Sequence, residues 1–147
     1  MPVVSYASVS ESPPLVAIAC NPDSFTCKLI LRSKSFSLSL LGREDTAKLG
    51  ALATTHGGEV TDKLLSAGLA HRKGEKLNVP VIASARATLE CSLESSRTLG
   101  DHRLLVGRVR AAHSDGTFTD SWDFRRYRPI LYTGWKDGMT SYEGPYE

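Results

Sequence analysis

A six-residue apolar run between two turn-forming segments constrains the fold of this chain more than any other feature. Leu15–Cys20 (LVAIAC) carries no charge, which is typical of a strand covered on both faces. Pro13 and Pro14 precede it, and because proline lacks a backbone N–H the chain must turn there. Asn21-Pro22-Asp23-Ser24 follows it and indicates the start of a helix. We therefore expect a turn, a buried strand, a second turn and a helix over residues 8–26.

The start of this predicted helix offers a seat for an anion. Asp23 or Ser24 has the side chain needed to cap the first turn, and Pro22 suits a position close to it. The first amides of a helix have no intrahelical acceptor and lie at the positive end of its dipole, so a phosphate group is favoured there. A simpler interpretation is that Ser8 and Ser10, before the proline pair, are ordinary turn residues.

The composition is that of one folded domain covering residues 1–147. With 41% hydrophobic and 23% charged residues the chain is neither disordered nor membrane-spanning in character. The net charge of +2 gives no general electrostatic field for nucleic acid. No secretory signal precedes the first expected strand, so the predicted compartment is the cytoplasm. Neither nucleic acid nor a membrane is an expected partner.

The cysteines argue against a disulfide framework or a zinc site. The chain has three cysteines, Cys20, Cys27 and Cys91, and an odd number cannot all pair within one chain. Their positions also lack CxxC or Cys/His metal-binding spacing. Cys20 and Cys91 fall within strand-like runs, where a cysteine is usually a small buried apolar residue. We predict no metal site.

Several other segments read as strands. Pro2–Ala7 is expected to be one, and Ser35–Leu41 alternates serine with Phe or Leu, which predicts a half-buried strand whose serines face solvent. Val81 to Ala112 predicts a long antiparallel hairpin that turns at Gly100-Asp101. In its first arm Ala, Leu and Cys alternate with polar residues such as Glu90. The whole pattern favours a β-rich barrel with a few short helices.

A helical insertion is expected between these strands. From Gly42 to Ala70 apolar residues recur at helix spacing, and a short helix over Asp62–Ala67 should stop at Gly68. His56 lies in a glycine-containing loop, where a lone histidine is more often a solvated residue than a catalytic one. No glycine-rich dinucleotide fingerprint and no GxSxG motif follows any strand.

The last part of the chain mixes aromatic and basic residues and allows two interpretations. Trp122, Trp135, Tyr127, Tyr132, Tyr142 and Tyr146 are interleaved with Arg125, Arg126, Arg128 and Lys136. Such a mixture can bind RNA by stacking. The interpretation that we favour is that Trp122, Phe124, Ile130 and Leu131 complete the barrel, because the rest of the chain has no matching basic stripe.

Four segments also carry a family resemblance. They are SVSESPPLVAIACNPDSFT, LNVPVIASARATLECSLE, GDHRLLVGRV and WDFRRYRPILYTG. Together and in this order they resemble the flavin reductase-like, FMN-binding split-barrel family. The resemblance implies a six-stranded Greek-key barrel that pairs into a homodimer, with FMN in a groove near the subunit boundary. Many members pass hydride from NADH or NADPH to flavin, and others are ferric reductases or flavoredoxin-type electron carriers.

The resemblance also implies roles for particular residues. Ser8, Val9 and Ser10 would bind the flavin ring and ribityl chain, largely through backbone groups. Asn21, Ser24 and Thr26 would hold the phosphate, with Lys28 or the Arg125-Arg126 pair as a further contact. His102 in the GDH turn would be the catalytic residue that orients substrate beside the flavin; a structural role for it, bonded to Asp101 or a carbonyl, is the alternative. In contrast to the family pattern, no strand precedes the segment that matches residues 2–8, which leaves a barrel edge to be covered.

The expected function is therefore that of an FMN-dependent oxidoreductase, an NAD(P)H:flavin or ferric reductase. It would pass hydride from reduced nicotinamide to bound FMN and electrons on to free flavin, iron or a partner oxygenase. A non-catalytic FMN-binding or flavin-carrier protein is the main alternative, and a small RNA-binding barrel is the third.

Overall fold

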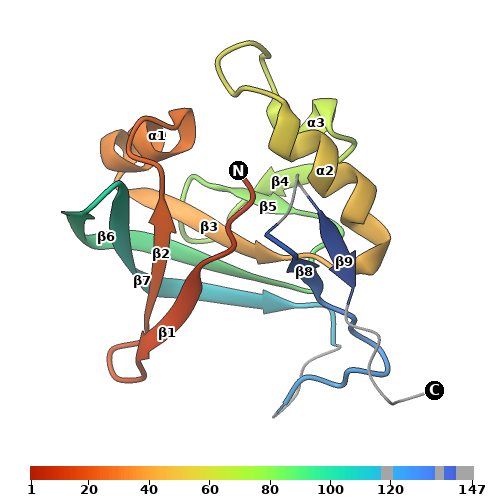
Figure 1. Ribbon diagram of the computed structural model, residues 1–147. Helices are drawn as coiled ribbons and strands as arrows, with labels where there is room; N and C mark the ends of the chain where they lie inside the picture. The colour runs from red at the N-terminus through yellow and green to blue at the C-terminus, as the bar shows by residue number, and fades with distance from the viewer. Residues whose placement is uncertain (117–120, 135–137, 142–147) are drawn as a thin grey trace.

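The computed structural model describes residues 1–116, 121–134 and 138–141, and its centre is a five-stranded antiparallel sheet (Figure 1). Across the sheet the order is β1 (Tyr6–Ser10), β2 (Leu15–Cys20), β7 (His102–Ser114), β6 (Ala87–Leu99) and β3 (Ser35–Leu40). Two further ribbons pair β4 (His71–Lys73) with β5 (Pro80–Ile82), and β8 (Ile130–Tyr132) with β9 (Met139–Ser141). The helices are α1 (Phe25–Ser33), the 3-10 turn η1 (Arg43–Asp45), α2 (Thr46–Thr54) and α3 (Lys63–Ser66). The predicted mainly-β class with a few short helices is confirmed.

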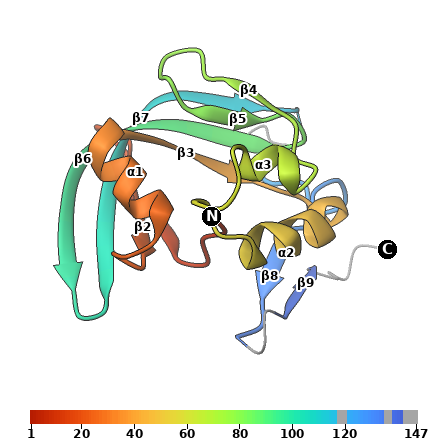
Figure 2. The same cartoon turned by 90° about the horizontal axis from the view of Figure 1, so that it is seen from above.

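The long hairpin β6–β7 curves around the molecule. Its pairing shifts register between Glu90 and Cys91 and again between Leu93 and Ser95, and such bulges bend a strand pair. Seen from above, α1 lies at one end of the sheet and α2 with α3 lies across from it, while the N-terminal segment runs between them (Figure 2). The first residues of the chain are therefore central in the fold.

Two apolar clusters hold these elements together. The larger joins α1 to the inner face of the sheet and consists of Val16, Ile18, Cys20, Cys27, Ile30, Phe36, Leu38, Cys91 and Leu105. The smaller joins α2 and α3 to the end of β3 and consists of Leu41, Leu52, Ala67 and Leu69. The predicted burial of Cys20 and Cys91 is confirmed, since both belong to the larger cluster.

Gly107 in β7 is required by the packing of this cluster. A Cβ atom there would lie 2.5 Å from Cζ of Phe36 and 2.9 Å from Cβ of Cys91. Because a core packed this closely has no room for a methyl group, Gly107→Ala is expected to destabilise the fold by about 2 kcal/mol.

Gly50 provides the matched control, because it lies in α2 and a Cβ atom there would meet nothing within 4 Å. Gly50→Ala should instead stabilise by up to about 1 kcal/mol through helix propensity. Urea unfolding of both variants checks the pair, and equal midpoints would contradict the packing argument.

Three strand predictions need correction. The first strand is Tyr6–Ser10 rather than Pro2–Ala7, because a short turn joins it to β2 and the pairing continues to that turn. Val81 does not start the long hairpin but lies in β5, since the chain turns before Ala87. The serines of β3 do not simply face solvent: the Ser37 hydroxyl donates to the Pro80 carbonyl, because the β4–β5 ribbon covers this face of the sheet.

In the aromatic segment near the C-terminus, Trp122 packs against buried Tyr127 with ring centroids 4.5 Å apart, and Ile130 packs against the smaller cluster. Phe124 and Leu131 are exposed, so they do not complete the core as expected. Trp135, Lys136, Tyr142 and Tyr146 lie outside the described residues. None of the helices in the described ranges is long and apolar enough to cross a membrane.

Candidate functional site

The turn between β2 and α1 forms the predicted helix start. The Ser24 hydroxyl accepts a hydrogen bond from the Cys27 backbone N–H at 3.1 Å, so Ser24 is the N-cap. The Asn21 side-chain oxygen accepts from the Asp23 N–H at 2.8 Å, and the Asn21 carbonyl accepts from the Ser24 N–H at 3.1 Å. These bonds fix the turn and leave the side-chain N–H groups of Asn21 available as donors.

The first turn of α1 presents backbone donors that the protein itself does not use. Among the residues that the structure describes, the N–H groups of Phe25 and Thr26 have no hydrogen-bond acceptor. The first turn also carries no acidic side chain. Lys28 is exposed one turn further on, and its backbone N–H is already bonded to the Ser24 carbonyl at 3.2 Å. The two unpaired amides and the helix dipole together make this end of α1 a fitting seat for a phosphate group.

The N-terminal residue lies near a lysine at the start of α3. Lys63 is partly buried, and burial lowers the pKa of its ammonium group. Burial, followed by repulsion from Lys63, lowers the pKa of the Met1 ammonium group to about 6. The Met1 side chain in turn reaches α1, where its sulfur lies 3.7 Å from the Ser24 hydroxyl. Lys63 and the Met1 ammonium group repel each other, so an anion bound close to them would favour the charged form of each.

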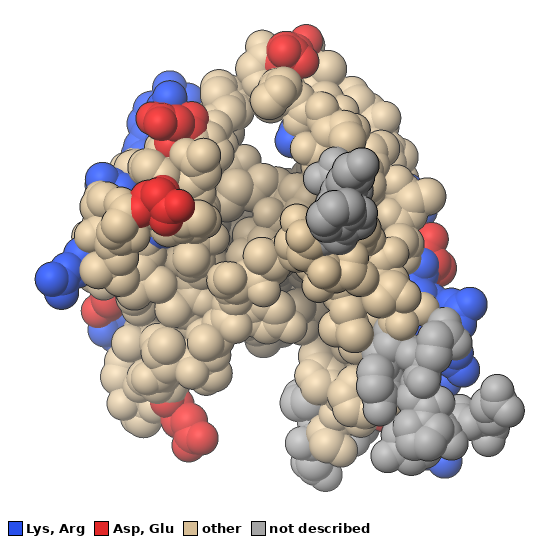
Figure 3. Space-filling view, in the orientation of Figure 1, with Lys and Arg blue, Asp and Glu red and all other residues tan. Residues whose placement is uncertain are grey.

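A loop from the α2–α3 connection closes one side of this region. The ring of Phe25, at the start of α1, lies so close to Gly57 that a Cβ atom on Gly57 would be 2.9 Å from Cδ1 of that ring. The space-filling view shows the surface hollowed between α1 and the α2–α3 side (Figure 3). His56 is exposed on this loop, and its carbonyl accepts from the Glu59 N–H at 3.1 Å.

His102 lies at the same end of the sheet as the α1 start. Cys20, the last residue of β2, pairs with Arg103 of β7, so Asn21 and His102 follow at neighbouring strand ends. His102 Nδ1 is 2.8 Å from Oδ1 of Asp101, and both side chains are exposed. This hydrogen bond lowers the pKa of Asp101. The imidazole therefore has its Nδ1 bonded to Asp101 in an exposed position.

The structure does not bring Ser8, Val9 and Ser10 to this end. Ser8 pairs with Val16 and Ser10 with Leu15, at the far end of β2 from Asn21. At about 3.4 Å per residue the two groups are separated by about 17 Å along the strand. One ligand could touch both only by lying extended along all of β2. Val9 is the extra residue of a bulge between Ser8 and Ser10.

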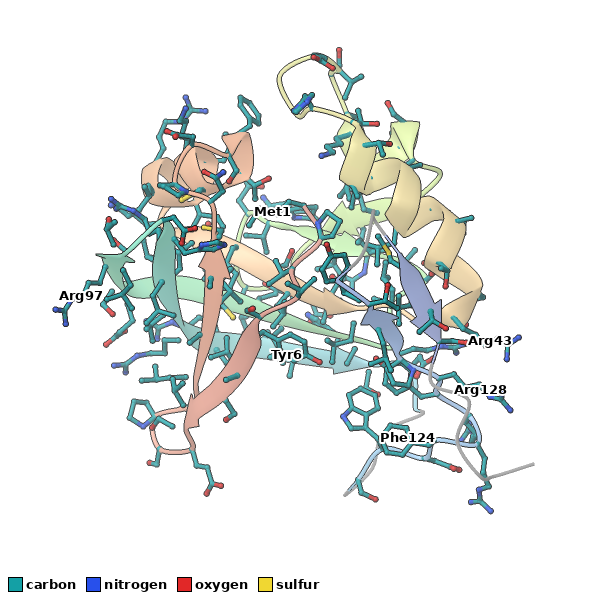
Figure 4. All side chains as sticks on the ribbon, in the orientation of Figure 1. Met1, Tyr6, Arg43, Arg97, Phe124 and Arg128 are labelled. Atoms are coloured by element: carbon teal, nitrogen blue, oxygen red, sulfur yellow. The ribbon has the colours of Figure 1, made fainter. Side chains whose placement is uncertain are left out.

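The segment that does approach the start of α1 is Met1–Ser5. The Ser5 carbonyl accepts from the Ala19 N–H at 3.2 Å, near the end of β2, and Met1 reaches Ser24. Figure 4 shows Met1 close to the α1 end and Tyr6 further down β1. Sequence reasoning missed this segment and Lys63. The position of Met1–Ser5 could have been predicted. Because β1 and β2 are antiparallel, the residues that precede β1 must approach the end of β2.

The described residues were also considered as metal ligands. Within residues 1–116, 121–134 and 138–141, no group of three or more His, Cys, Asp or Glu side chains is arranged to hold a metal ion. The arrangement that is present offers anion binding at the α1 start, with an imidazole nearby.

The structure therefore combines a bent antiparallel sheet with unpaired backbone donors at the start of α1. The comparisons with known proteins give the family to which this chain belongs. The family model described as "Flavin reductase like domain" matches residues 1–131. The FMN-binding protein from Thermus thermophilus, solved with bound p-hydroxybenzaldehyde, superposes with a TM-score of 0.81 at 29% identity, over 95% of this chain and 75% of that one. The chain belongs to the flavin reductase-like family.

Two sequence relatives are similar over most of the chain. An uncharacterised protein of Aeropyrum pernix is 32% identical over 130 residues, which is 88% of this chain. The NADH-dependent FAD reductase of Streptomyces globisporus is 31% identical over 135 residues, or 85% of this chain. The chain spans 49% of the first relative and 70% of the second.

Proposed function

We propose that the protein is an FMN-dependent oxidoreductase that passes hydride from NADH or NADPH to bound FMN and electrons on to an acceptor. The observation that carries this proposal is the start of α1, where the N–H groups of Phe25 and Thr26 lack an acceptor in the described structure, within a chain of the flavin reductase-like family. The proposed acceptors are free flavin, iron or a partner oxygenase. The last is supported by the name of a relative in Rhodococcus opacus, the reductase component of a 4-nitrophenol monooxygenase.

The residues present fit FMN at its phosphate end. Asn21, Thr26 and the cap residue Ser24 would hold the phosphate, with Lys28 of the same helix as a candidate cation. For Ser8, Val9 and Ser10 the proposed contact with the ring or ribityl chain requires FMN to lie along β2. When bound, FMN supplies the hydride and electron chemistry, so the chain needs no side-chain nucleophile. The chain itself would bind and orient FMN and exclude water from it.

His102 is proposed to position the nicotinamide. Asp101 engages Nδ1 through the 2.8 Å hydrogen bond, so Nε2 is the nitrogen that would contact a ligand at this end of the sheet. The unpaired outer edge of β1 within the described sheet is consistent with a homodimer, which we propose as the working assembly.

A non-catalytic FMN carrier would show the same phosphate seat. The two functions differ in a single experiment: FMN is titrated into the purified protein, and NADH is then added without oxygen. We expect saturable quenching of flavin fluorescence, followed by loss of the flavin absorption bands at a rate that rises with protein concentration. Binding without faster bleaching would favour the carrier, and absence of binding would contradict both.

Replacing His102 by Ala is expected to slow bleaching by NADH at least tenfold while FMN affinity stays within about twofold. His102 and Asp101 are both exposed at a hairpin tip, so the fold should not change. Stopped-flow reduction over a range of NADH concentrations checks this. Asp101→Asn, which keeps a hydrogen-bond acceptor for Nδ1, is the matched control and should act like the parent. Equal rates for His102→Ala and the parent would leave His102 a structural residue.

A further inference from the structure

A pocket of about 170 Å³ lies under the β4–β5 ribbon, on the face of the main sheet that is turned away from α1. Its lining includes Arg72 and Val81 of the ribbon and Thr88 and His113 of the long hairpin. Thr88 and Leu89 are successive residues of β6 and so point to opposite faces, and Leu89 packs against the larger cluster, which contains the buried residues of α1. The sheet therefore separates this pocket from the proposed phosphate seat.

Two cross-strand pairs contribute to this pocket from opposite sides. In the ribbon Arg72 is paired with Val81, and in the hairpin Thr88 is paired with His113. Paired residues of an antiparallel ladder share a face, and all four line the pocket. Val81 and Thr88 are 4% and 2% exposed, whereas the Arg72 side chain is 51% exposed. The pocket thus has a buried floor and a cation at its rim.

The rest of the lining is mostly small or apolar, and consists of Ile82, Ala83, Ala85, Ser114 and Asp115. Oδ2 of Asp115 already accepts a hydrogen bond from Arg86 at 2.7 Å, so this carboxylate is paired with a cation of the protein. An apolar cavity of about 150 Å³ has room for benzene. A pocket of about 170 Å³ therefore has room for a ligand built on one six-membered ring.

The polar groups that remain for a ligand are the Arg72 guanidinium and one ring nitrogen of His113. Arg72 Nη1 donates to the adjacent Lys73 carbonyl at 3.2 Å, and Nη2 is 3.9 Å from Oε1 of Glu75, too far for a hydrogen bond. His113 Nε2 is bonded to Glu90 at 2.7 Å, and its Nδ1 is 3.6 Å from Oε1 of Glu75. A guanidinium in this state binds a carboxylate through two parallel hydrogen bonds.

We propose that this pocket binds a small monocarboxylate with one aromatic ring, with benzoate as the probe. The carboxylate bonds to Arg72, and the ring lies on the apolar floor formed by Val81 and Ala85. A neutral amide of the same shape forfeits the charge-assisted bonds, and acetate leaves the floor uncovered. An amine would bring a second positive charge beside Arg72. This site does not depend on flavin binding.

The test is isothermal titration calorimetry of the purified full chain with benzoate. We expect saturable binding with a dissociation constant in the millimolar range or below, and at least tenfold weaker binding of benzamide and of acetate. Benzylamine should not bind. Saturating FMN should leave the benzoate affinity unchanged, because the sheet separates the pocket from the start of α1.

Two variants address the two halves of the pocket. Arg72→Gln removes the charge at the rim, and Ala83→Leu fills the space for the ring, so each should weaken benzoate binding at least tenfold. Both residues are exposed, so neither change should unfold the protein, and thermal unfolding checks this. Arg32→Gln is the matched control, because Arg32 is an exposed arginine in the last turn of α1 and does not line the pocket.

Three results would overturn the proposal. They are the absence of saturable benzoate binding, equal benzoate affinity in Arg72→Gln and Arg32→Gln, and tighter binding of benzylamine than of benzoate. Competition between FMN and benzoate would place the carboxylate at the start of α1 and would equally contradict the pocket. A protein that binds no FMN would end the proposed function, whereas the benzoate titrations of the parent and the variants would still report on the pocket.

Discussion

Glu90→Gln is expected to lower the free energy of unfolding at pH 7 by about 3 kcal/mol and the melting temperature by about 10 °C. Glu90 is 0% exposed in the middle of β6. Its carboxylate accepts hydrogen bonds from the backbone N–H groups of Glu75, Lys76 and Leu77, at 2.7, 2.9 and 2.8 Å. His113 Nε2 completes the shell at 2.7 Å. A glutamine at this site has one oxygen in place of two and turns an NH2 group toward donors.

The Glu90 carboxylate also makes the free energy of unfolding depend on pH. Burial alone would raise the pKa of Glu90, but the hydrogen bonds from His113 and the loop amides outweigh it and lower the pKa from 4.5 to about 2. Because the folded pKa is below the unfolded one, this contribution is complete above pH 4.5 and is lost as the pH falls toward 2. Urea unfolding between pH 7 and pH 2.5 measures it, and the stability difference between the parent and Glu90→Gln should shrink over that window.

Glu94→Gln is the matched control for Glu90→Gln. Glu94 lies in the same strand, is exposed, and pairs with Arg108 at 2.7 Å. An exposed ion pair contributes little, so its loss should leave the unfolding midpoint nearly unchanged at every pH. If Glu90→Gln were as stable as Glu94→Gln, the bonds to the loop would not be holding β6 and the β4–β5 ribbon together.

Sequence alternation could not identify Glu90, and the reason is physical. The pattern in β6 correctly puts Glu90 and Cys91 on opposite faces, and an alternating strand normally has one face toward water. Here the β4–β5 ribbon and its loop cover the second face, as Glu75 shows by donating to Glu90. That covering depends on contacts between residues distant in the chain, which a local pattern does not contain.

Part of the candidate site could likewise be predicted from the sequence, and part of it could not. The strand Leu15–Cys20, the cap at Ser24 and the placement of His102 follow from local signals or from the register of one hairpin. The approach of Lys63 to the Met1 ammonium group does not, because it depends on how α3 packs across the molecule. The predicted contacts of Ser8–Ser10 remain predictions, and their distance from Asn21 follows from the antiparallel pairing of β1 with β2.

Phe25→Pro is expected to weaken FMN binding about 10- to 100-fold without weakening the fold. Phe25 is the first residue of α1, the position where proline is favoured, because its fixed φ suits a helix and the N–H that it lacks has no helical partner. Ser24 already has φ −61° and ψ 141°, an extended conformation that a following proline accepts. The variant therefore removes one donor to the phosphate, and a charge-assisted hydrogen bond contributes about 1.5–3 kcal/mol.

The control for this change is Phe25→Ala, which removes the same ring but keeps the backbone N–H. Since that ring is 49% exposed and contacts Gly57, its loss should alter FMN affinity far less than the loss of the amide. Fluorescence titration of FMN gives the two dissociation constants, and thermal unfolding should show Phe25→Pro at least as stable as Phe25→Ala. Riboflavin, which has no phosphate, should bind both variants equally. Were FMN also to bind them equally, the phosphate would not lie at the start of α1, and the flavin would have to be sought elsewhere along β2.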